Sequence, residues 1–196
     1  MPEFAVQALD DVDCRAVVLV EGESDKAALT ELARRRGLPL DGVAILAMGG
    51  ATNLGHYLAR YGPAGMDLRL AGLCDVGEVP FFRHSLRRAG LGADLSADAM
   101  AELGFHVCDR DLEDELIRAL GTDVVEQLIE DQGDGWQLQT LRQQPAQRGR
   151  SAHDHLHRFM GVRSGRKVHY AGLLASALDL DRVPMALNDV LDHVTR

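Results

Sequence analysis

The stretch Ala16–Asp25, with the sequence AVVLVEGESD, decides the fold class of this chain. Five apolar residues in a row, Ala16–Val20, are typical of a strand that is buried on both faces of a parallel sheet. A polar turn follows at residues 21–25, where Ser24 can cap a helix, and Ala27–Arg36 has a helical pattern. A strand that leads through a turn into a helix predicts one unit of an α/β fold.

The same alternation recurs along the next ninety or so residues. Further strands are predicted at Val43–Ala47, Leu68–Cys74 and Gly104–Cys108, and further helices from Thr52 or Asn53 to about Tyr61, at Phe81–Ala89 and at Leu112–Leu120. Such alternation requires crossover connections, so it predicts an α/β fold with a doubly wound, mostly parallel, four-stranded sheet. After Asp123 the patterns are helical only. We expect an α/β core at residues 1–122 and a C-terminal helical extension at 123–196, packed on the core as a single structural unit.

The composition fits one compact core and excludes several classes. The chain has 196 residues, 46% hydrophobic and 5% aromatic, which suits helices on a sheet better than a β-sandwich. Cys14, Cys74 and Cys108 show no CxxC spacing, which argues against a disulfide framework or zinc ribbon and favours a reducing, cytoplasmic location. Cys74 and Cys108 lie in apolar runs and are expected to be buried. The start of the chain lacks a signal-peptide layout, and no apolar run approaches the roughly 20 residues of a membrane span, so no membrane association is expected.

Charge is distributed unevenly along the chain. The net charge of -9 argues against a DNA-binding protein that works through its overall charge. The segment from Arg142 to Lys167, however, contains seven basic residues and only one acidic residue, Asp154. Three histidines (His153, His155, His157) lie in the same segment. If the protein binds a polyanion, this segment is where contact is expected; a solvated basic surface is an equal alternative. For the histidines, contact with phosphate is favoured over a transition-metal site. The single tryptophan, Trp136, is expected to anchor the helical extension.

Acidic residues follow three of the four predicted strands. The residues at the four strand ends are Glu21 and Asp25, then Gly49 and Gly50, then Asp75 and Glu78, and finally Asp109, Asp111 and Glu113. Because the carboxyl ends of parallel strands form one edge, these side chains should converge there. Clustered carboxylates repel one another unless a cation lies between them, and hard oxygen ligands select Mg²⁺ or Mn²⁺. Such a site suits phosphoryl chemistry. The alternative is that each acid only caps the helix that follows it.

Several of these segments together resemble a known family. The segments are Val18–Lys26 (VLVEGESDK), Met48–Asn53 (MGGATN), Leu73–Asp75 (LCD), Asp109–Leu116 (DRDLEDEL) and Arg163–Lys167 (RSGRK). In this order they resemble the Toprim domain in the version found in OLD (overcoming lysogenization defect) family nucleases. The resemblance runs from about Ala16 to Ala175, and the first motif with the strand-end aspartate is its most specific part.

The resemblance implies a fold, a reaction and a set of roles. It implies a Toprim-like sheet and a metal-dependent nucleic-acid phosphodiester hydrolase of the OLD-like endonuclease type. The expected cofactor is Mg²⁺ or Mn²⁺, and DNA is favoured over RNA as the substrate. Glu21 would be a metal ligand or general acid-base group. Asp25, Asp75 and Glu113 would be metal ligands, and Lys167 would stabilise charge on the phosphate. Contacts to nucleic acid are expected from Arg150, Arg158, Arg163, Arg166 and Lys167.

Two departures from the family pattern qualify this expectation. Gly77 stands at the position of the second aspartate in the family's Asp-x-Asp pair. Glu78 would have to replace that aspartate as a ligand; otherwise the site would bind one metal ion in place of two. The alternative function is therefore a catalytically weakened Toprim module that binds nucleic acid or a partner protein. No GxxxxGK[ST] loop occurs, whereas OLD nucleases carry an ATPase domain ahead of the Toprim part. We thus expect the chain to be a stand-alone Toprim portion. It could associate with a separate ATPase protein, and it could form a homodimer. A phosphatase with an aspartate nucleophile ranks last, because the first strand lacks an Asp-x-Asp.

Overall fold

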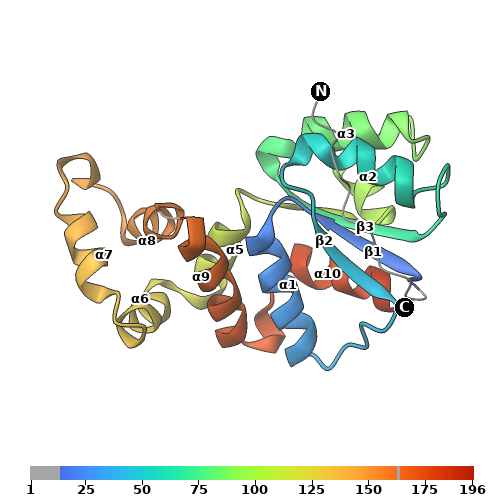
Figure 1. Ribbon diagram of the computed structural model, residues 1–196. Helices are drawn as coiled ribbons and strands as arrows, with labels where there is room; N and C mark the ends of the chain where they lie inside the picture. Colours follow the sequence, from blue (N-terminus) through green and yellow to red (C-terminus); the bar gives the residue numbers. More distant parts are fainter. Residues whose placement is uncertain (1–13, 163) are drawn as a thin grey trace.

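A parallel four-stranded sheet forms the centre of the molecule. The computed structural model describes residues 14–162 and 164–196 (Figure 1). Its strands are β1 (Ala16–Val20), β2 (Val43–Ala47), β3 (Arg69–Asp75) and β4 (Phe105–Cys108), in the spatial order β2-β1-β3-β4. Each neighbouring pair is parallel, and β1 is hydrogen-bonded to both β2 and β3. The predicted doubly wound α/β sheet is thereby confirmed.

Helices follow each strand and then continue to the end of the chain. They are α1 (Glu23–Arg35), α2 (Leu54–Tyr61), α3 (Val79–Arg88), α4 (Ala97–Glu102), α5 (Leu112–Leu120), α6 (Thr122–Asp131), α7 (Gly135–Arg142), α8 (Ala152–Gly161), α9 (Ser164–Ala177) and α10 (Met185–Thr195). Short 3₁₀ turns lie at η1 (Ala51–Asn53), η2 (Val76–Glu78), η3 (Pro145–Gln147) and η4 (Leu180–Arg182).

The two faces of the sheet bury alternate residues of the same strands. On β1, Val17 and Leu19 belong to one core with α2, α3 and α4. Val18 and Val20 belong to the other, with α1, α5, α9 and α10. The period of two residues explains this division, because successive side chains of a strand point to opposite faces. Figure 1 shows α2 and α3 above the sheet and α1 and α10 below it.

The predicted helical extension divides into a projecting part and a part that covers the sheet. Helices α6, α7 and α8 with the segments that connect them (residues 122–161), called the helical arm below, extend away from the sheet on one side (Figure 1). Helix α9 packs along α1, and α10 returns to cover β1, β3 and β4. The apolar side of α10 is fully buried, and a nitrogen of Arg69 on β3 donates to the carbonyl oxygen of Arg196 at 2.6 Å. The domain boundary at residue 122 stays a prediction.

Several local expectations are met and others corrected. Cys74 and Cys108 are buried and unpaired, as predicted. Within the described ranges, no helix is long and apolar enough to cross a membrane. Helix α1 begins at Glu23 and not at Ala27, because the extended Gly22 and not Ser24 occupies the N-cap. Helix α4 was not predicted, since its six residues are too few to show a period.

Candidate metal centre

The order of the strands places a crevice between β1 and β3. The chain runs from β1 to β2 on one side and then returns to β3 on the other side of β1. Ligands of open α/β sheets bind where the winding direction reverses in this way, beyond the carboxyl ends of the strands. Glu21 directly follows β1, and Asp75 is the last residue of β3. The sheet topology therefore brings these two acids to the crevice.

Asp25 enters the crevice from the first turn of α1. Its Oδ2 accepts a hydrogen bond from the Gly22 amide at 2.8 Å, which fixes the side chain at the helix start. The residue is buried, with 8% of its surface exposed. Burial raises the pKa of Asp25 above its ordinary value. Because α1 starts earlier than predicted, Asp25 is held by a helix and not by a turn.

A cavity of about 370 Å³ opens at this place. Glu21, Asp25, Asp75 and Lys167 all line it, together with the glycine turn after β2. Gly49 and Gly50 have left-handed φ values of 70° and 126°, a conformation that favours glycine. The predicted residues Glu78 and Glu113 are not part of its lining.

Helix α5 supplies two further acids near the crevice. Glu113 is 4% exposed, and its Oε1 has no hydrogen-bond partner among the described residues. Its Oε2 lies 3.2 Å from Nζ of Lys167, which comes from the first half of α9. Asp111 caps α5: its Oδ1 accepts from the Asp114 amide at 2.9 Å. No role of its own was assigned to Asp111 from the sequence. Its position after the fourth strand and before an apolar helix could have indicated that it caps the helix beside the site.

The acids influence one another strongly. Burial and nearby carboxylates raise the pKa of Asp75 to about 7. Those carboxylates belong to Asp25, Asp111 and Glu21. Burial also raises the pKa of Glu21, and the charges of Glu78 and Asp25 raise it further. Five acids from three chain segments, at residues 21–25, 75–78 and 111, thus share one electrostatic environment.

Two groups in this environment stay charged. Burial alone would raise the pKa of Asp111, but hydrogen bonds from His157 and the Asp114 amide outweigh it and leave the pKa lowered. Burial would lower the pKa of Lys167, but the charge and hydrogen bond of Glu113, together with the charges of Asp25 and Asp75, outweigh it and leave the pKa raised. Lys167 therefore lies among the acids as an ammonium ion.

The residues present fit a divalent metal ion by their chemistry. Among the residues that the structure describes, no three His, Cys, Asp or Glu side chains form a closed ligand cluster. The donors that meet here are nevertheless all carboxylates, the ligands that Mg²⁺ and Mn²⁺ prefer. A cation between them would relieve the repulsion at Asp75 and give the unpartnered Oε1 of Glu113 a partner.

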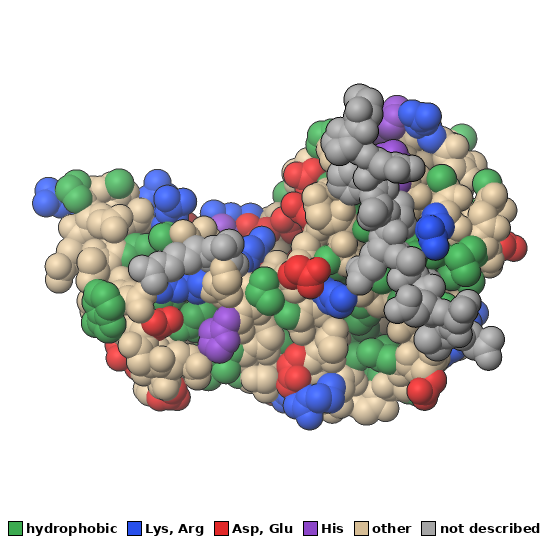
Figure 2. All heavy atoms as spheres, viewed as in Figure 1, with side chains coloured by type: hydrophobic (Ala, Val, Ile, Leu, Met, Phe, Trp, Pro, Cys, Tyr) green, Lys and Arg blue, Asp and Glu red, His purple; other side chains and the backbone are tan. Residues whose placement is uncertain are grey.

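The predicted nucleic-acid contacts fall into three groups. Arg150 and Arg158 are exposed on the helical arm and, within the described chain, form no ion pair. Figure 2 shows Lys and Arg side chains along the upper edge of the arm and acidic side chains on the adjoining flank of the core. Arg163 lies outside the described residues. Lys167 lies at the cavity, as described above.

Arg166 differs from the other arginines because its guanidinium is almost fully engaged. It donates to the side chain of Gln137 and lies 4.0 Å from the centre of the Phe159 ring. Only 9% of its side chain is exposed. This geometry favours a role in joining α9 to the arm over contact with nucleic acid.

The aromatic and histidine side chains of the arm are also placed. Trp136 is 68% exposed, so the prediction that it anchors the extension is wrong. Its neighbours Asp134 and Gly135 turn the chain, but the indole remains outside the core. Nε2 of His155 lies 3.0 Å from the carbonyl oxygen of Gln147 within the arm. His153 and His157 contact aspartates of α5.

Comparisons with known proteins agree on one family. Residues 14–75 match the family model described as "Overcoming lysogenization defect protein-like, TOPRIM domain". The fold is similar to the C-terminal region of the Xanthomonas campestris pv. campestris OLD protein, with a TM-score of 0.72, 25% identity, and coverage of 93% of this chain and 92% of that one. It is also similar to the C-terminal region of the Burkholderia pseudomallei OLD protein, with a TM-score of 0.68, 21% identity, and coverage of 93% and 97%. No curated protein sequence matches the chain.

Proposed function

Residues 14–75 match the Toprim domain of OLD-like proteins, and the fold is similar to the C-terminal region of an OLD protein. From these similarities we propose that the chain is a divalent-metal-dependent phosphodiesterase that cleaves nucleic acid. The observation that carries the proposal is the convergence of buried and half-buried carboxylates at the β1/β3 crevice, with Lys167 as the cation among them. This arrangement supplies hard oxygen ligands for Mg²⁺ or Mn²⁺ and a positive charge for a phosphate.

Each residue has a role that follows from its position in this proposal. Asp25 and Asp75, which line the cavity, would hold the metal, and Glu78 and Glu113 would support it from outside the lining. Glu21 follows β1 at the cavity, and its burial and the charges of Glu78 and Asp25 raise its pKa, which suits a group that takes up and returns a proton. A bound metal ion would polarise a phosphoryl oxygen and activate a water molecule. Lys167 would leave Glu113 to meet the negative charge of the phosphate.

The helical arm supplies the route for the nucleic acid in this proposal. Arg148, Arg150 and Arg158 are exposed on it, and Figure 2 shows the basic edge that leads from the arm towards the acidic flank of the core. Exposed arginines attract a phosphate backbone without reading its sequence. We favour DNA as the substrate, because this is what the family resemblance implies.

The direct test is nicking of supercoiled plasmid DNA in the presence of Mn²⁺. The wild-type protein is expected to nick the plasmid, and Glu21→Ala and Asp75→Ala are expected to abolish nicking. Glu31→Ala, which removes an ion pair with Arg34 on α1 outside the cavity lining, is the matched control and should retain activity. Equal activity of all four proteins would refute the assignment of the site.

A binding module without turnover is the second candidate function. It is favoured by Gly77, which stands where the family pattern has a second metal-binding aspartate. Calorimetric titration with Mn²⁺ distinguishes the two functions. Saturation at micromolar Mn²⁺ supports the phosphodiesterase, whereas binding only in the millimolar range supports the module.

A further inference from the structure

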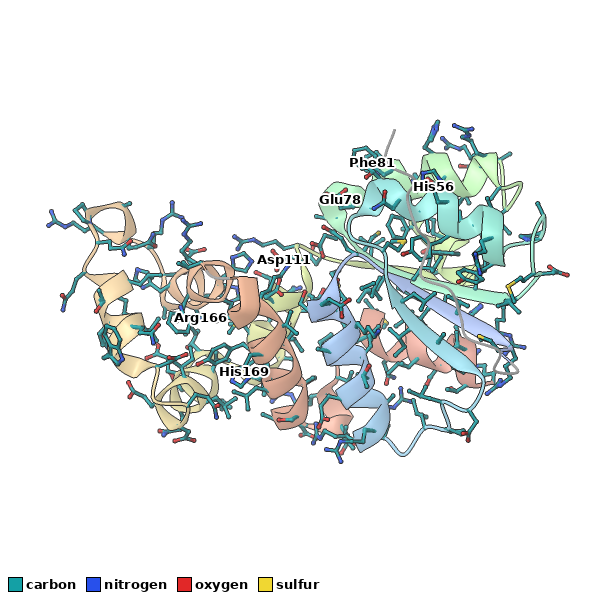
Figure 3. The ribbon with its side chains drawn as sticks, viewed as in Figure 1. His56, Glu78, Phe81, Asp111, Arg166 and His169 are labelled. Atoms are coloured by element: carbon teal, nitrogen blue, oxygen red, sulfur yellow. The ribbon has the colours of Figure 1, made fainter. Side chains whose placement is uncertain are left out.

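Two histidines one helical turn apart on α8 each contact an aspartate at the start of α5. Nε2 of His157 lies 2.6 Å from Oδ2 of Asp111, and Nε2 of His153 lies 2.7 Å from Oδ1 of Asp114. Residues four apart on a helix share one face, so the pair joins the helical arm to the core at two adjacent points. Figure 3 shows Asp111 where the arm meets the core.

The two aspartates have different surroundings. Asp114 is paired with basic side chains, since Nε of Arg118 lies 2.9 Å from its Oδ2 and a nitrogen of Arg110 lies 3.4 Å from its Oδ1. Asp111 instead lies at the N-cap of α5, after the carboxyl end of β4 and two residues before Glu113, and its negative charge acts on Asp25, Asp75 and Glu113. The His157–Asp111 contact therefore lies beside the acids of the site, whereas the charge of Asp114 is matched by arginines.

Both oxygens of Asp111 are held by hydrogen bonds. The Asp114 amide donates to Oδ1, and the His157 ring donates to Oδ2, so Nε2 of His157 carries the proton. Two bonds to two oxygens fix the plane of the carboxylate. Each oxygen keeps a further lone pair with which it can contact a cation. Hydrogen-bonded partners of this kind orient the carboxylates of metal sites and contribute to metal affinity.

We propose that His157 is a positioning residue of the metal centre, which holds the Asp111 carboxylate in the orientation that a divalent ion requires. The inference rests on the proposed function and extends it to the helical arm. Because His157 lies on α8, the helix that also bears Arg158, the place of the basic arm and the orientation of a carboxylate in the site depend on each other.

The test is the affinity for Mn²⁺, measured by isothermal titration calorimetry and without any substrate. His157→Leu is expected to weaken Mn²⁺ binding about 10- to 100-fold, the range found when such partners are removed. His157→Gln can place an amide N–H near the position of Nε2 and is expected to recover most of the affinity. His153→Leu is the matched control: it removes the neighbouring His–Asp contact of the same helix and should keep the wild-type Kd.

The outcomes separate the inference from the proposed function. A wild-type Kd in His157→Leu, or an equal loss in His153→Leu, would overturn the inference and leave the metal site standing. Failure of the wild-type protein to bind Mn²⁺ would overturn both. Thermal unfolding checks that the variants fold. If the leucine variant does not fold, His157→Ala gives the same comparison at this partly exposed position.

Discussion

At the scale of single residues, the carboxyl group of Asp75 links metal binding to pH. Its pKa of about 7 lies well above the ordinary value of 3.8, so at pH 6 the folded, metal-free protein holds a proton there that a metal must displace. We expect the affinity for Mn²⁺ to rise as the pH increases from 6 to 8. Calorimetry in buffers of different ionisation enthalpy would detect the released proton, and affinity that is independent of pH would contradict this assignment.

The same shift predicts the direction in which metal-free stability changes. A carboxyl group whose pKa is raised by folding favours the folded state while it is protonated. Its contribution is present below about pH 4 and is lost as the pH rises through about 7. Urea unfolding of the metal-free protein should therefore show lower stability at pH 8 than at pH 5, and Asp75→Asn should reduce this difference.

Lys167 provides a second prediction at this scale, because it is the counterion of a buried carboxylate. Replacement by methionine leaves Glu113 buried and unpaired. We expect a loss of about 1–2 kcal/mol in the free energy of unfolding without metal, less than the ~3–5 kcal/mol of a fully buried pair, because 43% of the lysine side chain is exposed. Denaturant unfolding measures the loss, and added Mn²⁺ should restore part of it. Arg34→Met, which removes an exposed ion pair, is the control and should change little.

Gly77 permits the opposite experiment, in which a carboxylate is added. An added Cβ at this position would meet no atom within 4 Å, and its φ lies outside the left-handed region. Gly77→Asp should therefore fold as the wild type does and increase the binding of Mn²⁺, either in affinity or in the number of ions bound. Gly77→Ala controls for the change in backbone freedom. If the aspartate and alanine variants bind Mn²⁺ equally, the position does not face the metal centre.

At the scale of elements, the packing of the Phe105 ring of β4 against β3 requires a glycine at position 72. A Cβ at Gly72 would lie 2.6 Å from an atom of the Phe105 ring on β4, and 3.1 Å from a backbone oxygen of β1. Gly72→Val should cost about 1–3 kcal/mol of stability, as overpacking of a core does, and should shift the strand that ends at Asp75. Chemical denaturation measures the cost. Gly55→Ala, whose Cβ would have only an ordinary contact at 3.8 Å, should not destabilise the protein.

The elements also show how far the sequence alone predicts this molecule. The strands and their terminal acids, such as Glu21 and Asp75, were predictable because apolar runs and the residues after them are local patterns. The pair of His157 with Asp111 was not, because 46 residues separate the two side chains and only the packing of α8 on α5 brings them together. The burial of Arg166 was missed for the same reason: its charge suggested a surface position, but the fold supplies Gln137 and an aromatic ring as partners.

At the scale of the whole molecule, the arm and the core combine opposite charges beside one crevice (Figure 2). If the arm guides DNA, the double variant Arg150→Gln/Arg158→Gln should weaken binding mainly at low salt. The slope of log K against log salt should fall by about 1.8, since each phosphate contact on duplex DNA contributes about 0.9. Fluorescence anisotropy with a labelled duplex measures this slope. Arg87→Gln, on α3, is the control, and an equal change there would indicate an effect of net charge only.

Helix α10 has a consequence for how the chain acquires its structure during synthesis. It covers one face of β1, β3 and β4 with Leu187, Val190, Leu191 and Val194, all fully buried. A ribosome makes β4 at residues 105–108 long before it makes this helix. Until α10 has been made, apolar side chains on the face of the sheet that it covers remain exposed to solvent. They can then aggregate or bind a chaperone. Native folding must therefore wait until residues 185–195 have left the ribosome.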